Sequence, residues 1–228
     1  MLNLQITALI LWFAPLLGVT AAYVLSVQAG EIAGCFPHLE GCVSISKAGR
    51  YPPGFFIFKA TMLPVAGFTM VYWKLCYDWL SAMGDAVSKQ RSIMLWLGVI
   101  ASLALILYTT FLGSDGEGYQ LMRRFGTAIY FGFTYLAQVL LAARIRAVSP
   151  ARPELHNIVR LKIAMCGVIL AGGLLMAATH NLFDGDDEIQ NIAEWNVATM
   201  MAFYPFLTWL LWRRSGFEVR SSVKLANS

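Results

Sequence analysis

Residues 93–112 read IMLWLGVIASLALILYTTFL, a stretch of 20 residues without a single charge. A helix of this length spans about 30 Å, which is the thickness of the hydrocarbon core of a bilayer. In the whole chain, 58% of the residues are apolar and 13% are charged, whereas an ordinary soluble domain has about 25% charged residues. The stretch therefore predicts a membrane-spanning helix. The composition excludes a disordered chain, a coiled coil, a disulfide-dense secreted module and a typical soluble enzyme.

Five further apolar runs of similar length predict five more helices. The six expected spans lie at about 5–27, 54–82, 93–112, 124–143, 163–180 and 192–212. Almost every residue belongs to a span or to a short connector, so no separate soluble domain fits. We expect an all-α fold, a polytopic membrane protein with a six-transmembrane-helix bundle that forms one domain over 1–228.

The basic residues predict how this bundle faces. On one side, 12 of the 17 Lys and Arg residues, Lys162 among them, accompany four acids, whereas five basic and nine acidic residues lie on the other side. Because loops rich in Lys and Arg stay in the cytoplasm, both termini are expected there and the loops 28–53, 113–123 and 181–191 on the opposite side. Residues 27–29 are similar to a signal-peptide cleavage site, but the chain before the first span lacks Lys and Arg, which favours an uncleaved helix.

Membrane lipids are the partners that this composition indicates. The basic cytoplasmic face would attract anionic headgroups, although the topology signal alone also explains it. The basic tail 213–228 offers a surface for a cytoplasmic partner. No nucleic-acid-binding motif occurs, so a nucleic acid is not expected. The membrane is the plasma or inner membrane or that of the ER or Golgi, depending on the source.

Two of the four cysteines, Cys35 and Cys42, are seven positions apart in the first expected outer loop. On an oxidising side of the membrane this spacing favours a disulfide. The alternative is a metal site that uses His38 between the two thiols, but it lacks a fourth ligand and a regular spacing. Cys76 and Cys166 lie in spans and are expected to pack as small apolar residues.

Metal and haem cofactors are not expected. The chain has only three histidines, His38, His156 and His180, and His156 is expected on the opposite side of the membrane from the other two. Paired histidine ligands of a haem, or the several histidines of a zinc hydrolase, cannot be assembled from this set.

Polar side chains from several spans are expected at one depth, the headgroup boundary of the non-cytoplasmic leaflet. Ionisable residues in spans are costly, and their default interpretation is function. The guanidinium groups suit a phosphate and a lysine adds a second charge, while the acid would pair with one of the cations and the histidine could act as a general base. The candidates for catalysis are His180 and Glu194, and those for substrate binding are Lys59, Tyr108, Arg123, Arg124 and Asn181.

Each of these residues also has a structural interpretation. Lys59 can snorkel to the interface, Arg123 and Arg124 can simply flank a span, Glu194 can serve as an ion-pair partner, and His180 with the following Asn can cap a helix. Ser44 and Ser46 in the outer loop stand in no recognisable nucleophile motif. The expected common depth of the residues is what favours a joint site.

Several short motifs resemble the FRAG/DRAM/SFK membrane protein family. The stretch CVSISKAGRYPPGFFIF at 42–58 is similar to that family's first outer loop and second helix. The YW pair at 72–73, the HN pair at 180–181 and the AEW and MAF motifs at 193–195 and 201–203 are similar to its branch of post-GPI-attachment, GPI-anchor lipid-remodelling proteins. Where relatives often carry a His at the start of the fourth helix, this chain has Arg123 and Arg124.

The resemblance implies a six-helix protein that acts on lipids or senses them. In the GPI branch the implied role is replacement of an acyl chain on a lipid anchor, whereas the other branches imply autophagy modulation or scaffolding of a lipid kinase. Our first hypothesis is a lipid-remodelling protein of the acyl-transfer type that binds a headgroup at the non-cytoplasmic leaflet. The second is a non-enzymatic lipid-binding or scaffold protein, and the third is a small transporter, which the apparent lack of ionisable residues near the midplane disfavours.

Overall fold

In a computed structural model, the described residues are 4–182 and 187–219, without the side chains of 151 and 176–182. They form long helices joined by short connectors, with no strand in these ranges. The long helices are α1 (Ile6–Gln28), α4 (Gly54–Ala82), α5 (Ser88–Phe111), α6 (Glu117–Val148), α7 (His156–Leu182) and α8 (Asp187–Arg214). The short ones are α2 (Pro37–Glu40), α3 (Ile45–Ala48), η1 (Ser149–Ala151) and η2 (Pro153–Leu155).

The prediction of a helical membrane protein is confirmed. Among the described residues, α1, α4, α5, α6 and the stretch Pro153–Leu175, which includes most of α7, are long and apolar enough to cross a membrane. α8 falls short of this standard. It carries Glu194, Asn196, Pro205, one Tyr and three Trp residues. The sixth crossing and the cytoplasmic location of the termini therefore stay predictions.

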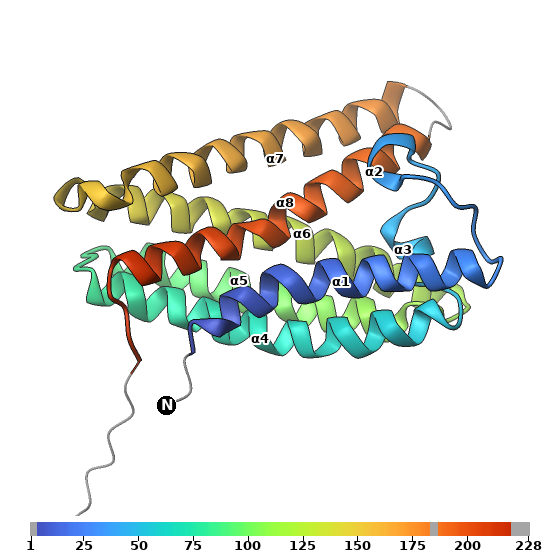
Figure 1. The fold of residues 1–228 in the computed structure, drawn as a ribbon, viewed down its shortest axis with the longest axis horizontal. Coiled ribbons are helices and arrows are strands. Elements are labelled where there is room, and N and C mark those ends of the chain that lie inside the picture. The colour runs from blue at the N-terminus through green and yellow to red at the C-terminus, as the bar shows by residue number, and fades with distance from the viewer. Residues whose placement is uncertain (1–3, 183–186, 220–228) are drawn as a thin grey trace, which may run out of the picture.

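The six long helices lie side by side along one axis (Figure 1), and their contacts close them into a ring. Each packs on its neighbours in the order α1, α4, α5, α6, α7, α8 and back to α1, and the α6–α7 contact is the least extensive. The start of α1 and the end of α8 lie at one end of the bundle, which we call the terminal end, and α2 and α3 lie at the other, the loop end (Figure 1).

Small residues let the helices of this ring approach closely. At Gly126 of α6, an added Cβ would lie 2.8 Å from the backbone nitrogen of Tyr108 in α5. A larger residue there would push the two helices apart. Bulky aromatic side chains, including Tyr72, Trp73 and Tyr204, fill the centre of the ring and are at most 2% exposed.

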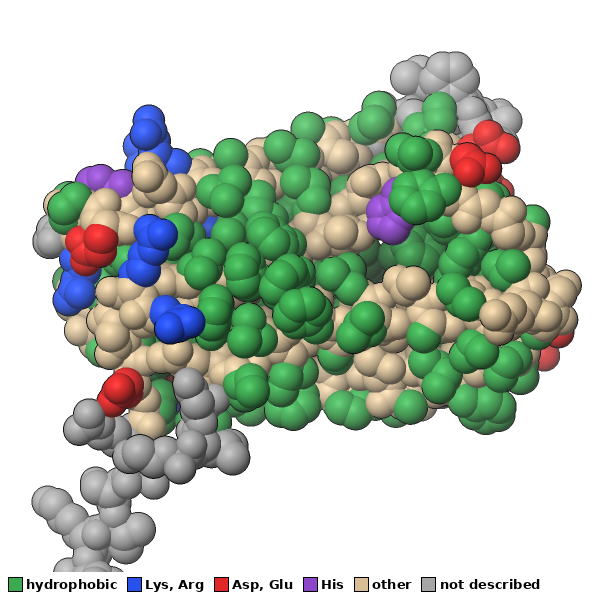
Figure 2. All heavy atoms as spheres, in the orientation of Figure 1, with side chains coloured by type: hydrophobic (Ala, Val, Ile, Leu, Met, Phe, Trp, Pro, Cys, Tyr) green, Lys and Arg blue, Asp and Glu red, His purple; other side chains and the backbone are tan. Residues whose placement is uncertain are grey.

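Charges divide between the two ends of the bundle. On the face in Figure 2, Lys and Arg side chains gather toward the terminal end, where some acidic side chains also lie, whereas the charged side chains seen at the loop end are acidic. The distribution follows the sequence prediction with one correction. Lys162, which the sequence groups with the surface residues of the basic side, is completely buried, because its side chain extends into the core beside Tyr204.

A disulfide joins Cys35 and Cys42 at the loop end, with 6.4 Å between the Cα atoms. The predicted disulfide is thus supported over the alternative metal site. His38 is turned away to α8, where its Nε2 atom lies 3.1 Å from Thr199 Oγ1. The other two cysteines, Cys76 and Cys166, are buried free thiols.

Candidate functional site

The largest cavity that we describe has a volume of about 830 Å³ and lies near the loop end between α6, α7 and α8. It adjoins the contact between α6 and α7, the weakest in the ring. Its apolar wall comes from residues of these three helices: Ala128, Phe131, Ile169, Leu170, Leu174, Val197 and Met201. Leu170 and Leu174 are about half exposed, at 48% and 62%, so the wall also faces the surroundings of the bundle.

Polar side chains gather at one part of this cavity. They are contributed by the end of α3 and the residues after it, by α5, by the first turns of α6 and by α8: Ser46, Arg50, Tyr108, Gln120, Arg123, Arg124 and Glu194. Three guanidinium groups and one carboxylate leave an excess of positive charge. An anionic group would be stabilised there.

Arg123 and Arg124 are placed by the second turn of α6. The guanidinium of Arg123 donates to the carbonyl oxygen of Ser114 at 2.7 Å, which ties the α5–α6 connector to the helix. Arg124 is exposed and makes no hydrogen bond to another described residue. One of the pair is thus held by the protein, whereas the guanidinium group of the other makes no hydrogen bond within the described part of the chain and can bind a ligand.

Glu194 lies on α8, opposite these cations, and lines both the large cavity and a second, interior one. The backbone N–H groups of Ile45 and Ser46 at the start of α3 lie near its carboxylate and interact favourably with it. The charges of Glu194, Arg50 and Arg123 all act on the hydroxyl of Tyr108. Glu194 therefore interacts with the loop at α3, lines the cavities and lies near the buried hydroxyl of Tyr108.

Arg50 was not a candidate from the sequence, because a lone arginine in an outer loop resembles an ordinary flanking charge. In the structure it lines the cavity, and its Nε atom is buried without a hydrogen-bond partner among the described residues. A buried donor of this kind is uncommon. The position of Arg50 just before the Pro52–Pro53 pair is the one sequence signal that could have drawn attention to it.

Lys59 is not brought to the cavity. Its ammonium group donates to the carbonyl oxygen of Thr110 at the end of α5 at 2.8 Å and lies 4.1 Å from the ring centroid of Phe55. It lines neither described cavity. In the structure the lysine is a residue of the α4–α5 contact, which neither the predicted joint site nor the snorkelling interpretation specified.

The other predicted residues divide as follows. Tyr108 is 6% exposed and lines both cavities. His180 and Asn181 belong to the last turn of α7, but their side chains lie outside the described residues, so their roles stay predictions. The structure thus brings together Tyr108, Arg123, Arg124 and Glu194, and adds Arg50.

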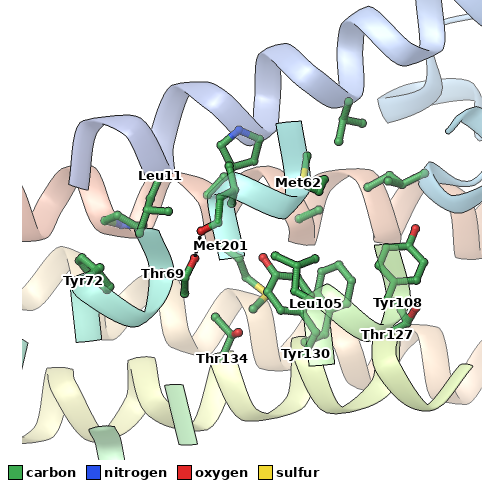
Figure 3. A pocket seen from close by; sticks show the side chains of 18 of the residues that line it. Leu11, Met62, Thr69, Tyr72, Leu105, Tyr108, Thr127, Tyr130, Thr134 and Met201 are labelled. Atoms are coloured by element: carbon green, nitrogen blue, oxygen red, sulfur yellow. Dashed lines mark hydrogen bonds between the residues drawn. The ribbon is translucent and has the colours of Figure 1, made fainter. Parts of the chain in front are cut away.

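The interior cavity adjoins the large one on the side of the ring's centre, and both are lined by Tyr108, Thr127, Phe131, Glu194 and Met201. Figure 3 shows most of its side chains, which come from α1, α3, α4, α5, α6 and α8. Its volume is about 100 Å³. The acid therefore stands where a wide peripheral cavity meets a narrow central one.

The helices, their charge distribution and the cavities define a multi-pass integral membrane protein with a polar site near one end of its bundle. Residues 3–211 match the family model described as Frag1/DRAM/Sfk1/Cwh43P N-terminal domain. The chain therefore belongs to this family. Comparisons with curated proteins and with solved structures found no match for the chain.

Proposed function

We propose that the protein binds a membrane lipid in the cavity between α6, α7 and α8. The phosphate or another anionic headgroup lies among Arg50, Arg123 and Arg124, and an acyl chain lies along the apolar wall. The observation that carries the proposal is one cavity of about 830 Å³ that combines three guanidinium groups with a partly exposed apolar wall. A phospholipid or an anionic glycolipid has this same division into charge and hydrocarbon.

The depth of the polar residues supports this proposal. Glu194 is the eighth residue of α8, and Arg123 and Arg124 are the seventh and eighth residues of α6. At 1.5 Å per residue, each lies about 10 Å from the loop end of its helix. Under the predicted orientation, this is the region just below the surface of the non-cytoplasmic leaflet, where a headgroup joins its acyl chains.

The proposed reaction is exchange of an acyl chain, as the GPI-remodelling branch suggests. Glu194 takes the proton from the hydroxyl of the acceptor, whose oxygen attacks the ester carbonyl of the bound lipid. A guanidinium group stabilises the oxyanion. The proton then passes to the departing alcohol as the old ester bond breaks, which restores the carboxylate. His180 is the second candidate for the proton-transfer role.

One observation favours a second function, binding without chemistry. The carboxylate of Glu194 already interacts with two backbone N–H groups of α3, as a purely structural acid would. In that case the protein presents or senses its lipid, and the basic tail can serve a cytoplasmic partner. Loss of Glu194 would then disturb the loop and leave lipid composition unchanged.

Lipids that co-purify with the protein test the binding step. We expect mass spectrometry to find an anionic lipid with the wild type and at least about ten-fold less with Arg124→Ala, because one charge-assisted contact contributes about 1.5–3 kcal/mol. Lys59→Ala removes a cation outside the cavity and is the matched control. Equal retention by the two variants would contradict the proposed site.

Acyl-chain composition of whole cells tests the chemical step. Cells that express the wild type should differ from cells without the protein, and Glu194→Gln, at normal abundance and with lipid still bound, should abolish the difference. A binding-only protein would give no difference in any of these cells. If the wild type retains its lipid but acyl-chain composition does not change, the proposed binding site is supported and the proposed reaction is refuted.

A further inference from the structure

Lys162 of α7 is the one lysine of the described residues whose side chain has no exposed surface. Its Nζ atom donates to Thr208 Oγ1 at 2.7 Å and to the carbonyl oxygen of Tyr204 at 3.2 Å, and it lies 3.3 Å from the centroid of the Tyr204 ring. No described acid lies within ion-pair distance. A lysine held in a membrane core in this way is expensive, and such residues commonly mark pathways for ions or protons.

The groups that face Lys162 come from three helices. α4 contributes Cys76, and Cys166 lies on α7 itself. α8 contributes Tyr204 and Thr208. All of these groups can accept or share a proton, and none is a carboxylate. The environment of the lysine is therefore rich in exchangeable protons but supplies no fixed counter-charge.

Two short hydrogen bonds continue from this lysine toward the centre of the ring. Thr208 Oγ1 lies 2.7 Å from Lys162 Nζ and 2.7 Å from the hydroxyl oxygen of Tyr72 on α4. With a charged lysine, Thr208 accepts from Nζ and donates to Tyr72. With a neutral lysine, Tyr72 can donate to Thr208 and Thr208 to Nζ. The same three groups thus remain hydrogen-bonded in both protonation states.

Tyr72 is where this chain of hydrogen bonds reaches the interior cavity, which it lines together with Thr69, Thr134 and Gln138 (Figure 3). Thr134 and Gln138 are 7% and 2% exposed, and Thr134 Oγ1 and Gln138 Oε1 are buried without a hydrogen-bond partner among the residues that the structure describes. Buried polar atoms of this kind normally bind water. The cavity volume of about 100 Å³ suffices for about three molecules at roughly 30 Å³ each.

The opposite end of the interior cavity is lined by Glu194. Glu194 also borders the large cavity, which gives it access to the loop end. At the other extreme, Lys162 lies six residues after His156, where α7 begins, or about 9 Å along the helix from its terminal end. An amine and a carboxylate therefore stand near opposite ends of the bundle, and between them lies the interior cavity, which is mostly apolar but contains the polar groups of Thr69, Tyr72, Thr134 and Gln138.

We propose that this arrangement is a proton pathway through the bundle, from Lys162 through Thr208, Tyr72 and water in the interior cavity to Glu194. The ammonium group gives a proton to the Thr208 oxygen, whose own proton passes to Tyr72, and Tyr72 releases its proton to the water chain. The last water protonates the Glu194 carboxylate. One N–H bond breaks, one O–H bond forms at the acid, and the hydroxyls and water are restored, so no oxidant or reductant is required.

The pathway does not depend on acyl exchange, because it uses the lipid site only through Glu194. A structural lysine that simply fills the core is the alternative. Replacement of such a lysine by Met would leave proton movement unchanged. The two interpretations therefore differ in a measurement that is independent of lipid composition.

Proton flux into sealed vesicles tests the proposal. Purified full-length protein is reconstituted in liposomes that contain a pH-sensitive dye, and a potassium gradient with valinomycin drives proton entry. We expect flux above that of protein-free vesicles for the wild type and for Lys59→Met, whose ammonium group lies outside both cavities. Lys162→Met should reduce the flux to the protein-free level.

A second variant keeps the test decisive if Lys162→Met does not fold. Thr134→Val has nearly the same shape and removes only an unpartnered hydroxyl, so folding should survive, whereas the flux should fall. Thr61→Val, whose hydroxyl bonds within α4 at Ile57 outside both cavities, is its control. Wild-type flux equal to protein-free vesicles, or unchanged flux in Thr134→Val, would overturn the pathway and leave the lipid site untouched.

Discussion

Asp85, between α4 and α5, shows how much one side chain can organise at the terminal end. Its carboxylate is fully buried and forms a bidentate contact with Arg144 of α6. The Nη1 atom of Arg91 of α5 lies 3.9 Å from Asp85 Oδ2. Burial alone would raise the pKa of the Asp85 carboxyl, but the hydrogen bonds from Arg144 and from the backbone of Val87, together with the two positive charges, lower it below its usual value. One acid thus joins three helices.

The first prediction concerns Asp85→Asn. The change leaves two largely buried guanidinium groups without their counter-charge, which should cost about 3–5 kcal/mol, measured as a loss of thermal stability in detergent. Because the folded-state pKa is lowered, the wild type should lose this contribution as the pH falls below the ordinary Asp value of 3.8. Asp85→Asn should lack that part of the acid sensitivity.

Lys74→Ala on the exposed i,i+4 pair with Asp78 is the control for Asp85→Asn. An exposed pair contributes about 0–1 kcal/mol. If the two variants unfold at the same temperature, the contacts of Asp85 do not have the importance that we assign to them.

At the scale of elements, α8 is the support of the disulfide-bonded loop 29–53. Trp195 Nε1 donates to the carbonyl oxygen of Val43 at 2.8 Å, Asn191 donates to that of Gly41 at 2.8 Å, and Asn196 donates to that of His38 at 2.9 Å. These polar residues satisfy loop carbonyls. They also explain why α8 is less apolar than the other long helices.

The second prediction is that Trp195→Phe loosens this loop. The change keeps an aromatic ring but removes the donor, so the Val43 carbonyl loses its partner at a cost of about 1–3 kcal/mol. Limited proteolysis should cut loop 29–53 faster than in the wild type. Trp96→Phe, at a residue of α5 that is 62% exposed, should not change the rate; similar cleavage in both would refute this role for Trp195.

At the scale of the whole molecule, the closed ring sets the predicted topology. α1 begins and α8 ends at the same end (Figure 1), and the Lys and Arg side chains on the face in Figure 2 gather toward that end. If all six long helices cross the membrane, the two termini lie on the same side. If α8 does not cross, they lie on opposite sides.

The third prediction follows from this parity. Tags on the N- and C-terminus should both be digested by protease in sealed vesicles that expose the cytoplasmic face, and both be protected in vesicles of the opposite orientation. Protection of one tag and digestion of the other would mean an odd number of spans. Membrane solubilisation, which exposes both tags, is the control.

The sequence predicted the helices more completely than the candidate site. The bounds of the second span were predicted as 54–82 and observed as Gly54–Ala82, because Pro53 precedes the apolar run and Met83-Gly84 follows it. The fourth span was predicted at 124–143, but α6 covers Glu117–Val148. Its additional turns carry polar residues, and the hydrocarbon criterion on which the prediction rests does not count them.

Lys59 and Arg124 illustrate why the site could be predicted only in part. Both lie near the loop end of an apolar helix, as their sequence positions indicate, yet Arg124 lines the cavity and Lys59 caps the end of α5. Position along a helix follows from counting residues at 1.5 Å each. The direction in which a residue faces depends on how each helix is rotated against its neighbours, which counting does not give.

The sequence by itself determined that this chain crosses a membrane through several helices, with basic residues gathered toward one side, because hydrophobic length and charge are properties of local windows. Only the tertiary structure decided that Arg50 joins Arg123, Arg124 and Glu194, and that Lys162 is buried against Tyr204 and Thr208. These contacts join residues distant in sequence, and the packing of six helices in a ring fixes which side chains meet.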